Sequence, residues 1–114
     1  EINVKLGMLL EHLKLENTGL LKAEPLPVNI SASGIRLTLK EPSSAGDLME
    51  IKMLLPGSPP AAVVAYGNVV RVAEREAGSF ETAIRFADLD HDVQDAIIRY
   101  TLNRQREIIW KLRQ

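Results

Sequence analysis

The sequence contains no cysteine and few aromatic residues, and its charges nearly cancel. Without cysteine there is no disulfide framework, no thiolate metal site and no cysteine nucleophile, so we expect a reducing, cytoplasmic location. The formal net charge of −1 provides no basic surface to displace counterions from a nucleic-acid backbone. Aromatic residues make up 4% of the chain, which leaves few platforms for stacking unpaired bases. We therefore expect no nucleic-acid polymer as a partner.

Long apolar runs are missing too. No stretch approaches the roughly 20 apolar residues that span a bilayer, and no signal-peptide pattern opens the chain, so we expect no membrane insertion. The 114 residues, 46% of them hydrophobic, suffice for one domain with a single core. The chain begins at Glu1 rather than at methionine, so we expect it to be part of a longer protein.

Both ends of the chain carry helical patterns. Apolar residues near the start recur with a helical period and predict an amphipathic helix over residues 2–15: Ile2, Leu6, Leu9, Leu10 and Leu13. At the other end, acidic residues precede and basic residues follow a second helical stretch, as the helix dipole favours. Asp88 and Asp90 are the candidate N-caps of this final helix.

Between the two ends, apolar and polar residues alternate with a period of two. This pattern predicts strands over residues 35–39, 49–55, 61–73 and 80–86, with a bulge or bend at Gly67. The predicted fold is mainly β: an antiparallel barrel flanked by an N-terminal and a long C-terminal α-helix. We assign the N-terminal helix and a linker to residues 1–22, and the barrel with its final helix to residues 23–114.

Residues 28–37, VNISASGIRL, contain a polar motif, Asn29-x-Ser31-x-x-Gly34, between two predicted strands. Asparagine and serine side chains can bond nearby backbone groups, and Gly34 can adopt a positive φ, so the motif can form a tight turn. If the same groups point outward, they offer an amide, a hydroxyl and backbone N–H groups to a phosphate or a base edge. Both interpretations remain open at this point.

The motif and the order of the strands resemble the PilZ domain, the bacterial receptor module for cyclic di-GMP. The resemblance also rests on residues 67–72 (GNVVRV), on residues 83–86 (AIRF) and on Asp88-Leu89-Asp90, and it covers roughly residues 26–114. It implies a regulatory domain in the bacterial cytoplasm that passes cyclic di-GMP levels to motility, surface-polysaccharide or transcription machinery.

The resemblance also implies a ligand site in two parts. Asn29, Ser31 and Gly34 match the part that contacts a guanine edge and a phosphate. The other part, an upstream RxxxR loop, has no counterpart, because no arginine precedes Arg36. Either the site has decayed, or these arginines lie before Glu1. If cyclic di-GMP binds, Arg36 and Arg71 are the candidate substitute cations, whereas we interpret Arg71-x-x-x-Arg75 as a chance match.

The final helix carries two apolar stripes. Val93, Ile97 and Tyr100 form one stripe, which can pack on the barrel. The second has the spacing of a coiled-coil seam and comprises Ile98, Leu102, Gln105, Ile109 and Leu112. It is covered either by the N-terminal helix of the same chain or by a second copy. In the second case Ile98, Leu102, Ile109 and Leu112 form an oligomer interface.

No constellation in the sequence supports catalysis. His12 and His91 are the only histidines, and we interpret His91, between Asp90 and Asp92, as a solvated helix start rather than a metal ligand. We predict no enzyme activity, no metal and no cofactor beyond cyclic di-GMP as a candidate ligand. The expected function is signalling through contacts with a protein partner or a neighbouring domain, with dinucleotide binding weakened or lost. The alternatives are a structural oligomerisation domain and an OB-type ligand-binding barrel.

Overall fold

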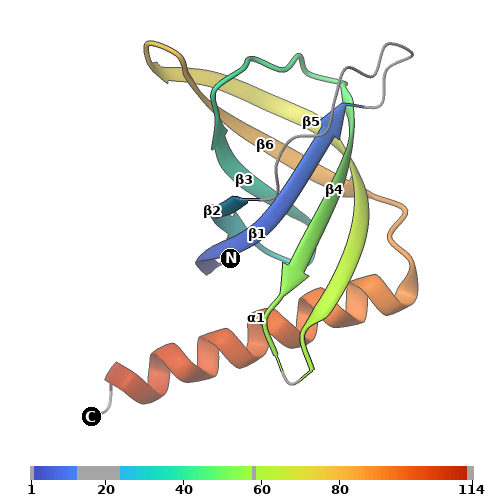
Figure 1. The fold of residues 1–114 in the computed structure, drawn as a ribbon, viewed down its shortest axis with the longest axis vertical. Coiled ribbons are helices and arrows are strands. Elements are labelled where there is room, and N and C mark those ends of the chain that lie inside the picture. The colour runs from blue at the N-terminus through green and yellow to red at the C-terminus, as the bar shows by residue number, and fades with distance from the viewer. Residues whose placement is uncertain (1, 13–23, 58, 113–114) are drawn as a thin grey trace.

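Six antiparallel strands close into a barrel in the computed structural model, which describes residues 2–12, 24–57 and 59–112 (Figure 1). Around the barrel the strands follow the order β1-β2-β3-β6-β5-β4. The elements are β1 (Ile2–His12), β2 (Glu24–Ile30), β3 (Gly34–Leu39), β4 (Leu48–Leu55), β5 (Ala61–Glu76), β6 (Ser79–Ala87) and α1 (His91–Leu112). The predicted mainly β fold with a long C-terminal helix is confirmed.

The predicted N-terminal helix over residues 2–15 is wrong. Residues 2–12 form β1, while residues 13–15 lie outside the described part of the chain. β1 pairs with β2 on one side and with β4 on the other, so it closes the barrel. β1 lies in the segment 1–22, which the sequence predicts as a helix and linker outside the barrel of residues 23–114. In the structure this strand is part of the barrel.

A period of two in the first ten residues explains the error. Every even-numbered residue from Ile2 to Leu10 is apolar and buried, whereas Asn3 and Lys5 are exposed. The helical interpretation used Ile2, Leu6, Leu9 and Leu10 of this stretch. It did not use Val4 and Met8, which complete the alternation of a half-buried strand.

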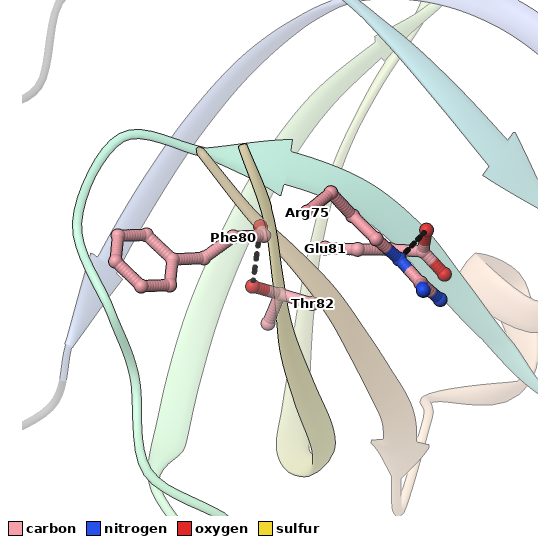
Figure 2. Close-up of polar contacts among 4 residues, drawn as sticks. All are labelled: Arg75, Phe80, Glu81 and Thr82. Atoms are coloured by element: carbon pink, nitrogen blue, oxygen red, sulfur yellow. Dashed lines mark hydrogen bonds and ion pairs between the residues drawn. The ribbon is translucent and has the colours of Figure 1, made fainter. Parts of the chain in front are cut away.

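The inward-facing residues of all six strands form one apolar core, and Ile97 of α1 joins it. Thr82 is the one fully buried polar side chain among the described residues, and its Oγ1 donates a hydrogen bond of 3.2 Å to the Phe80 carbonyl (Figure 2). Because this hydroxyl has a partner inside the barrel, its burial carries no unpaired-donor penalty.

Two glycines allow neighbouring strands to approach β6 closely. A Cβ atom on Gly34 would lie 2.4 Å from the Ile84 carbonyl oxygen, and one on Gly67 would lie 2.6 Å from Cγ2 of Ile84. Gly34 does not adopt the positive φ expected of a turn glycine; among the described residues, the glycines that do are Gly46 and Gly78. Gly34 is therefore required by strand packing rather than by the turn.

α1 crosses one end of the barrel, and its C-terminal end lies away from the strands (Figure 1). Asp90 occupies the N-cap position, where its carbonyl accepts a hydrogen bond from the Gln94 N–H at 2.9 Å. Val93, Ala96 and Tyr100 pack against the core beside the buried Ile97. Within the described residues, no helix has the length and apolar character needed to cross a membrane.

Candidate functional site

The polar motif forms the turn between β2 and β3. The Ser31 N–H donates to the Gly34 carbonyl at 3.0 Å, so Ala32 and Ser33 make the turn itself. Oγ of Ser31 lies 3.1 Å from Oγ of Ser33 and accepts a longer bond, 3.4 Å, from the Ser33 N–H. The Phe86 N–H donates to the Ser33 carbonyl at 3.0 Å, which attaches the turn to β6. Ser31 thus forms hydrogen bonds within the turn.

Asn29 and the two candidate arginines lie in one register row across five strands. Asn29 pairs with Asn3 on β1 and with Arg36 on β3. Arg36 pairs with Ala83 on β6, and Ala83 pairs with Arg71 on β5. Residues that face each other across a sheet point to the same side of it. The structure therefore brings Asn29, Arg36 and Arg71 together on the outer wall of the barrel, with Asn3 beside them.

Arg71 reaches the outer wall because β5 contains a bulge. Val69 pairs with Ile84 and Arg71 pairs with Ala83, so Val70 is an extra residue in β5. Both Val70, with 47% of its surface exposed, and Arg71 consequently face the solvent. Without the extra residue, the alternation that buries Val69 would also turn Arg71 inward. The strand does contain a bulge, but at Val70, three residues after Gly67, where the sequence predicts it.

A shallow hollow of about 210 Å³ lies on this wall, and we call it the wall hollow. Its lining comprises Asn3, Pro27, Val28, Asn29, Arg36, Leu37, Thr38 and Glu81. Asn29 and Arg36 thus line the hollow, whereas Ser31 and Gly34 lie at the turn and Arg71 lies two strands farther along the row. Sequence reasoning missed Asn3 and Thr38; the alternation in β1 was the signal that could have found Asn3.

The one carboxylate in the lining of the wall hollow has a basic partner. Glu81 Oε2 lies 3.3 Å from Nε of Arg75, which reaches it from β5 (Figure 2). This pairing offsets the negative charge of Glu81 beside Arg36. Arginine offers planar, permanently charged donors that match phosphate oxygens, and an asparagine amide can pair with a base edge. The wall therefore carries groups suited to an anionic ligand with a base.

A larger hollow of about 660 Å³ lies between part of α1 and the barrel, and we call it the helix hollow. It is lined by Asn3, Val4, Lys5, Pro27, Pro56, Gly57, Tyr100, Asn103, Arg104 and Glu107. Burial raises the pKa of Tyr100 above its usual value. Arg104 and Glu107 form an ion pair of 2.9 Å on the helical side. Asn3 and Pro27 line both hollows, so the two are adjacent.

His91 lies at the exposed start of α1, with Nδ1 3.7 Å from Oδ1 of Asp95. Across residues 2–12, 24–57 and 59–112, no three histidine or acidic side chains gather closely enough to hold a metal ion. The side chain of His12 is outside the described part.

The predicted oligomer interface lies on the far half of α1. Leu102, Ile109 and Leu112 are 47%, 51% and 82% exposed, while Ile98 is half-buried. Residues 2–12 form a strand inside the barrel wall, so they cannot cover this stripe as a helix. Its coverage by a second copy stays a prediction.

Comparison with known proteins identifies the family. The PilZ domain family model matches residues 13–103, well over half of the chain. Among solved structures, the inhibitor of motility MotI/DgrA of Bacillus subtilis has the same fold, with a TM-score of 0.68 over 94% of this chain at 17% identity. The match spans 51% of that protein, so the chain corresponds to about half its length. No curated protein matches. The chain therefore belongs to the PilZ domain family, a family of regulatory domains.

Proposed function

We propose that this chain is a non-catalytic regulatory domain of the bacterial cytoplasm. It signals through contacts with protein and retains weak affinity for cyclic di-GMP. The dinucleotide contacts Asn29, Ser31 and Gly34 of the polar motif, and Arg36 and Arg71 replace the cations of the missing RxxxR loop.

One observation carries this proposal: the register row that joins Asn29, Arg36 and Arg71 on the outer wall. An amide for a guanine edge and two guanidinium groups for phosphates are the groups that such a ligand needs. The wall hollow offers a concave surface at Asn29 and Arg36. The bulge in β5 supports the proposal further, since it turns Arg71 toward this wall.

The expected weakness also has a structural reason. Arg36 and Arg71 belong to β3 and β5, on either side of β6, so their backbones stand about two strand spacings, roughly 10 Å, apart. Both are fixed on strands and cannot close over a ligand as a loop can. Because Ile2 pairs with Ile30, arginines located before Glu1 in a longer protein would stand beside the motif and increase the affinity.

Calorimetric titration of this chain with cyclic di-GMP at moderate salt tests the proposal. We expect a dissociation constant above roughly 10 μM, and a further loss of about tenfold in Arg36→Ala and in Arg71→Ala. Arg106→Ala, an exposed position on the far half of α1, is the matched control and should leave the affinity unchanged.

The titration is repeated at a second temperature, because a binding enthalpy can pass through zero at one temperature. No heat at either temperature would refute dinucleotide binding by this chain. Submicromolar binding would show that the two arginines suffice and that the predicted weakness is wrong. Equal losses in Arg36→Ala and Arg106→Ala would refute the assigned site.

A further inference from the structure

The two sides of α1 differ in the half that extends beyond the barrel. Along the barrel side, Val93, Ile97 and Tyr100 pack on the core. The same side continues with Arg104 and Glu107, which form an ion pair with each other. The side that would face the barrel is therefore polar beyond Tyr100, so this half of the helix does not extend the core.

The apolar residues of this half lie on the other side of the helix. Each residue advances by about 100°, so the centre of this outer stripe lies roughly 150° from the barrel side. The outer stripe comprises Ile98, Leu102, Gln105, Ile109 and Leu112. Three of its members are about half or more exposed, and Ile108 beside it is 39% exposed. This is the seam pattern of a helix that packs on another helix.

This half of α1 is basic: Arg99 and Arg106 flank the outer stripe, whereas Arg104 and Lys111 lie on the barrel side. From Ile98 to Leu112 the helix has four positive side chains, Arg99, Arg104, Arg106 and Lys111, and one negative side chain, Glu107, a net charge of +3. Arg99 and Arg106 follow Ile98 and Gln105 directly, which places them at the e positions, where coiled-coil partners are selected by charge. A complementary partner therefore has acidic residues at its flanking positions.

Two other occupants fit less well. A second copy would bring two segments of net charge +3 together over a seam of only two heptads, shorter than the three to four heptads typical of a stable coiled coil. A membrane surface would bury Gln105, at the centre of the outer stripe, without a hydrogen-bond partner. A partner helix can satisfy this amide across the seam and use it to fix the register.

We propose that the outer stripe of α1 is the docking site for an acidic amphipathic helix of another protein. The proposal rests on the proposed function, since it names the partner class for its protein contacts. The apolar seam buries Leu102 and Ile109, and Arg99 and Arg106 pair with acidic residues of the partner helix.

Two synthetic peptides serve as probes. Both have three heptads with leucine at positions a and d; one has glutamate and the other lysine at positions e and g. Like charges keep each peptide from pairing with itself. Trp110 is the only tryptophan and is 65% exposed. It lies between Ile98 and Leu112 on α1, so its fluorescence reports peptide binding there. We expect the acidic peptide to bind at least tenfold more tightly than the basic one.

Variants of the chain separate apolar from electrostatic contributions. Leu102→Glu with Ile109→Glu should abolish binding of the acidic peptide, and Arg99→Glu with Arg106→Glu should reverse the preference between the peptides. Leu54→Glu is the matched control, because Leu54 is 50% exposed on β4 and should leave peptide binding unchanged. Circular dichroism of each variant verifies that the barrel remains folded.

Three outcomes would overturn this inference. They are equal affinity for both peptides, a dimer in sedimentation that the Leu102→Glu and Ile109→Glu changes abolish, and binding to anionic phosphatidylserine vesicles without binding of the acidic peptide. Cyclic di-GMP is absent from these measurements, so the peptide result and the dinucleotide titration can fail independently.

Discussion

The inward and outward residues of the stretch 28–37 serve different purposes. Val28, Ile30, Ile35 and Leu37 point into the barrel and are buried. Their neighbours on the outer wall are polar and only partly covered, and they include Asn29, Ser31 and Arg36. Because successive residues of a strand point to opposite sides, one short segment can build the core and present a binding surface at once.

The polar motif contributes both to the turn and to the outer wall. Gly34 lies in the outward row of β3, two residues before Arg36, and pairs with the exposed Arg85; its missing side chain makes room for the Ile84 carbonyl. Ser31 contributes to the turn, while Asn29 faces outward in the row with Arg36. The turn and the outward-facing candidate site therefore belong to one segment, whose inward residues build the core. Changes on the inner side, and at Gly34 with its close backbone contact, should affect stability, whereas changes at the outward-facing Asn29 and Arg36 should affect binding.

Ile30→Ala should have the largest effect. Ile30 is fully buried, so removal of three carbon atoms leaves a cavity and costs about 3–4 kcal/mol of unfolding free energy. Urea unfolding followed by circular dichroism measures the loss. Asn29→Ala, the adjacent outward position, is the control and should change stability by less than about 0.5 kcal/mol. Similar losses at both positions would contradict the distinction between the two sides.

Gly34→Ala should come next, with a loss of about 2 kcal/mol, because the new methyl group meets backbone atoms that cannot rotate away. Gly7→Ala is the matched control: a Cβ there lies 3.9 Å from Cβ of Leu54, an ordinary contact. A strand glycine with such space gains or loses little on becoming alanine. The same urea experiment compares the two, and an unaffected Gly34→Ala variant would show that the strands can separate at no cost.

Most of the fold was predictable because its patterns are local. Local patterns over residues 35–39, 49–55, 61–73 and 80–86 identified four strands, and charge order with spacing identified α1. β1 was missed since its residues satisfy both a helical and a strand period over part of their length. The choice between them depends on β2 and β4, whose pairing with β1 is a long-range property of the barrel.

The candidate site was predictable only in part. The motif indicated Asn29 and Ser31, but the alignment of Asn29 with Arg36 and Arg71 depends on the register of four strands. The bulge at Val70 decides the direction of Arg71, and its position could not be derived from a run of valines with uniform strand propensity. Asn3 joined the row only when β1 was known.

Ser31→Trp tests the outer side directly. A bulky ring at the turn should obstruct the approach to Asn29 and weaken cyclic di-GMP binding about tenfold, roughly 1.4 kcal/mol. Because Ser31 is partly exposed, unfolding free energy should change by less than about 0.5 kcal/mol. Ala45→Trp, in the exposed loop before β4, is the control for adding an indole. Affinity equal to that of the unchanged chain would remove Ser31 from the site.

The smallest expected effect concerns the pKa values of the two tyrosines, one on the outer wall and one on α1. The pKa of Tyr66, exposed on the outer wall, is raised chiefly by a hydrogen bond to Glu50 and then by its negative charge. The pKa of Tyr100, on the barrel side of α1, is raised chiefly by burial. In both cases the folded chain holds the phenol proton more tightly than the unfolded chain. The stability that results is present below about pH 10 and is lost as the pH rises through the raised pKa.

Glu50→Gln should separate these two causes. The variant removes the negative charge beside Tyr66 and replaces the carboxylate acceptor of its hydrogen bond with a neutral amide, which is a weaker acceptor. The pKa of Tyr66 should therefore fall toward its usual value, whereas that of Tyr100 should not change. Tyr66→Phe and Tyr100→Phe backgrounds each leave a single tyrosine, because the chain has two, and absorbance of the phenolate gives each midpoint alone. If Glu50→Gln leaves the pKa of Tyr66 unchanged, or shifts the pKa of Tyr100 as well, then the raised pKa of Tyr66 does not arise from its contact with Glu50. If only Tyr66 responds, the Glu50 carboxylate controls ionisation of Tyr66 on the outer wall, and burial controls that of Tyr100 on the barrel side of α1.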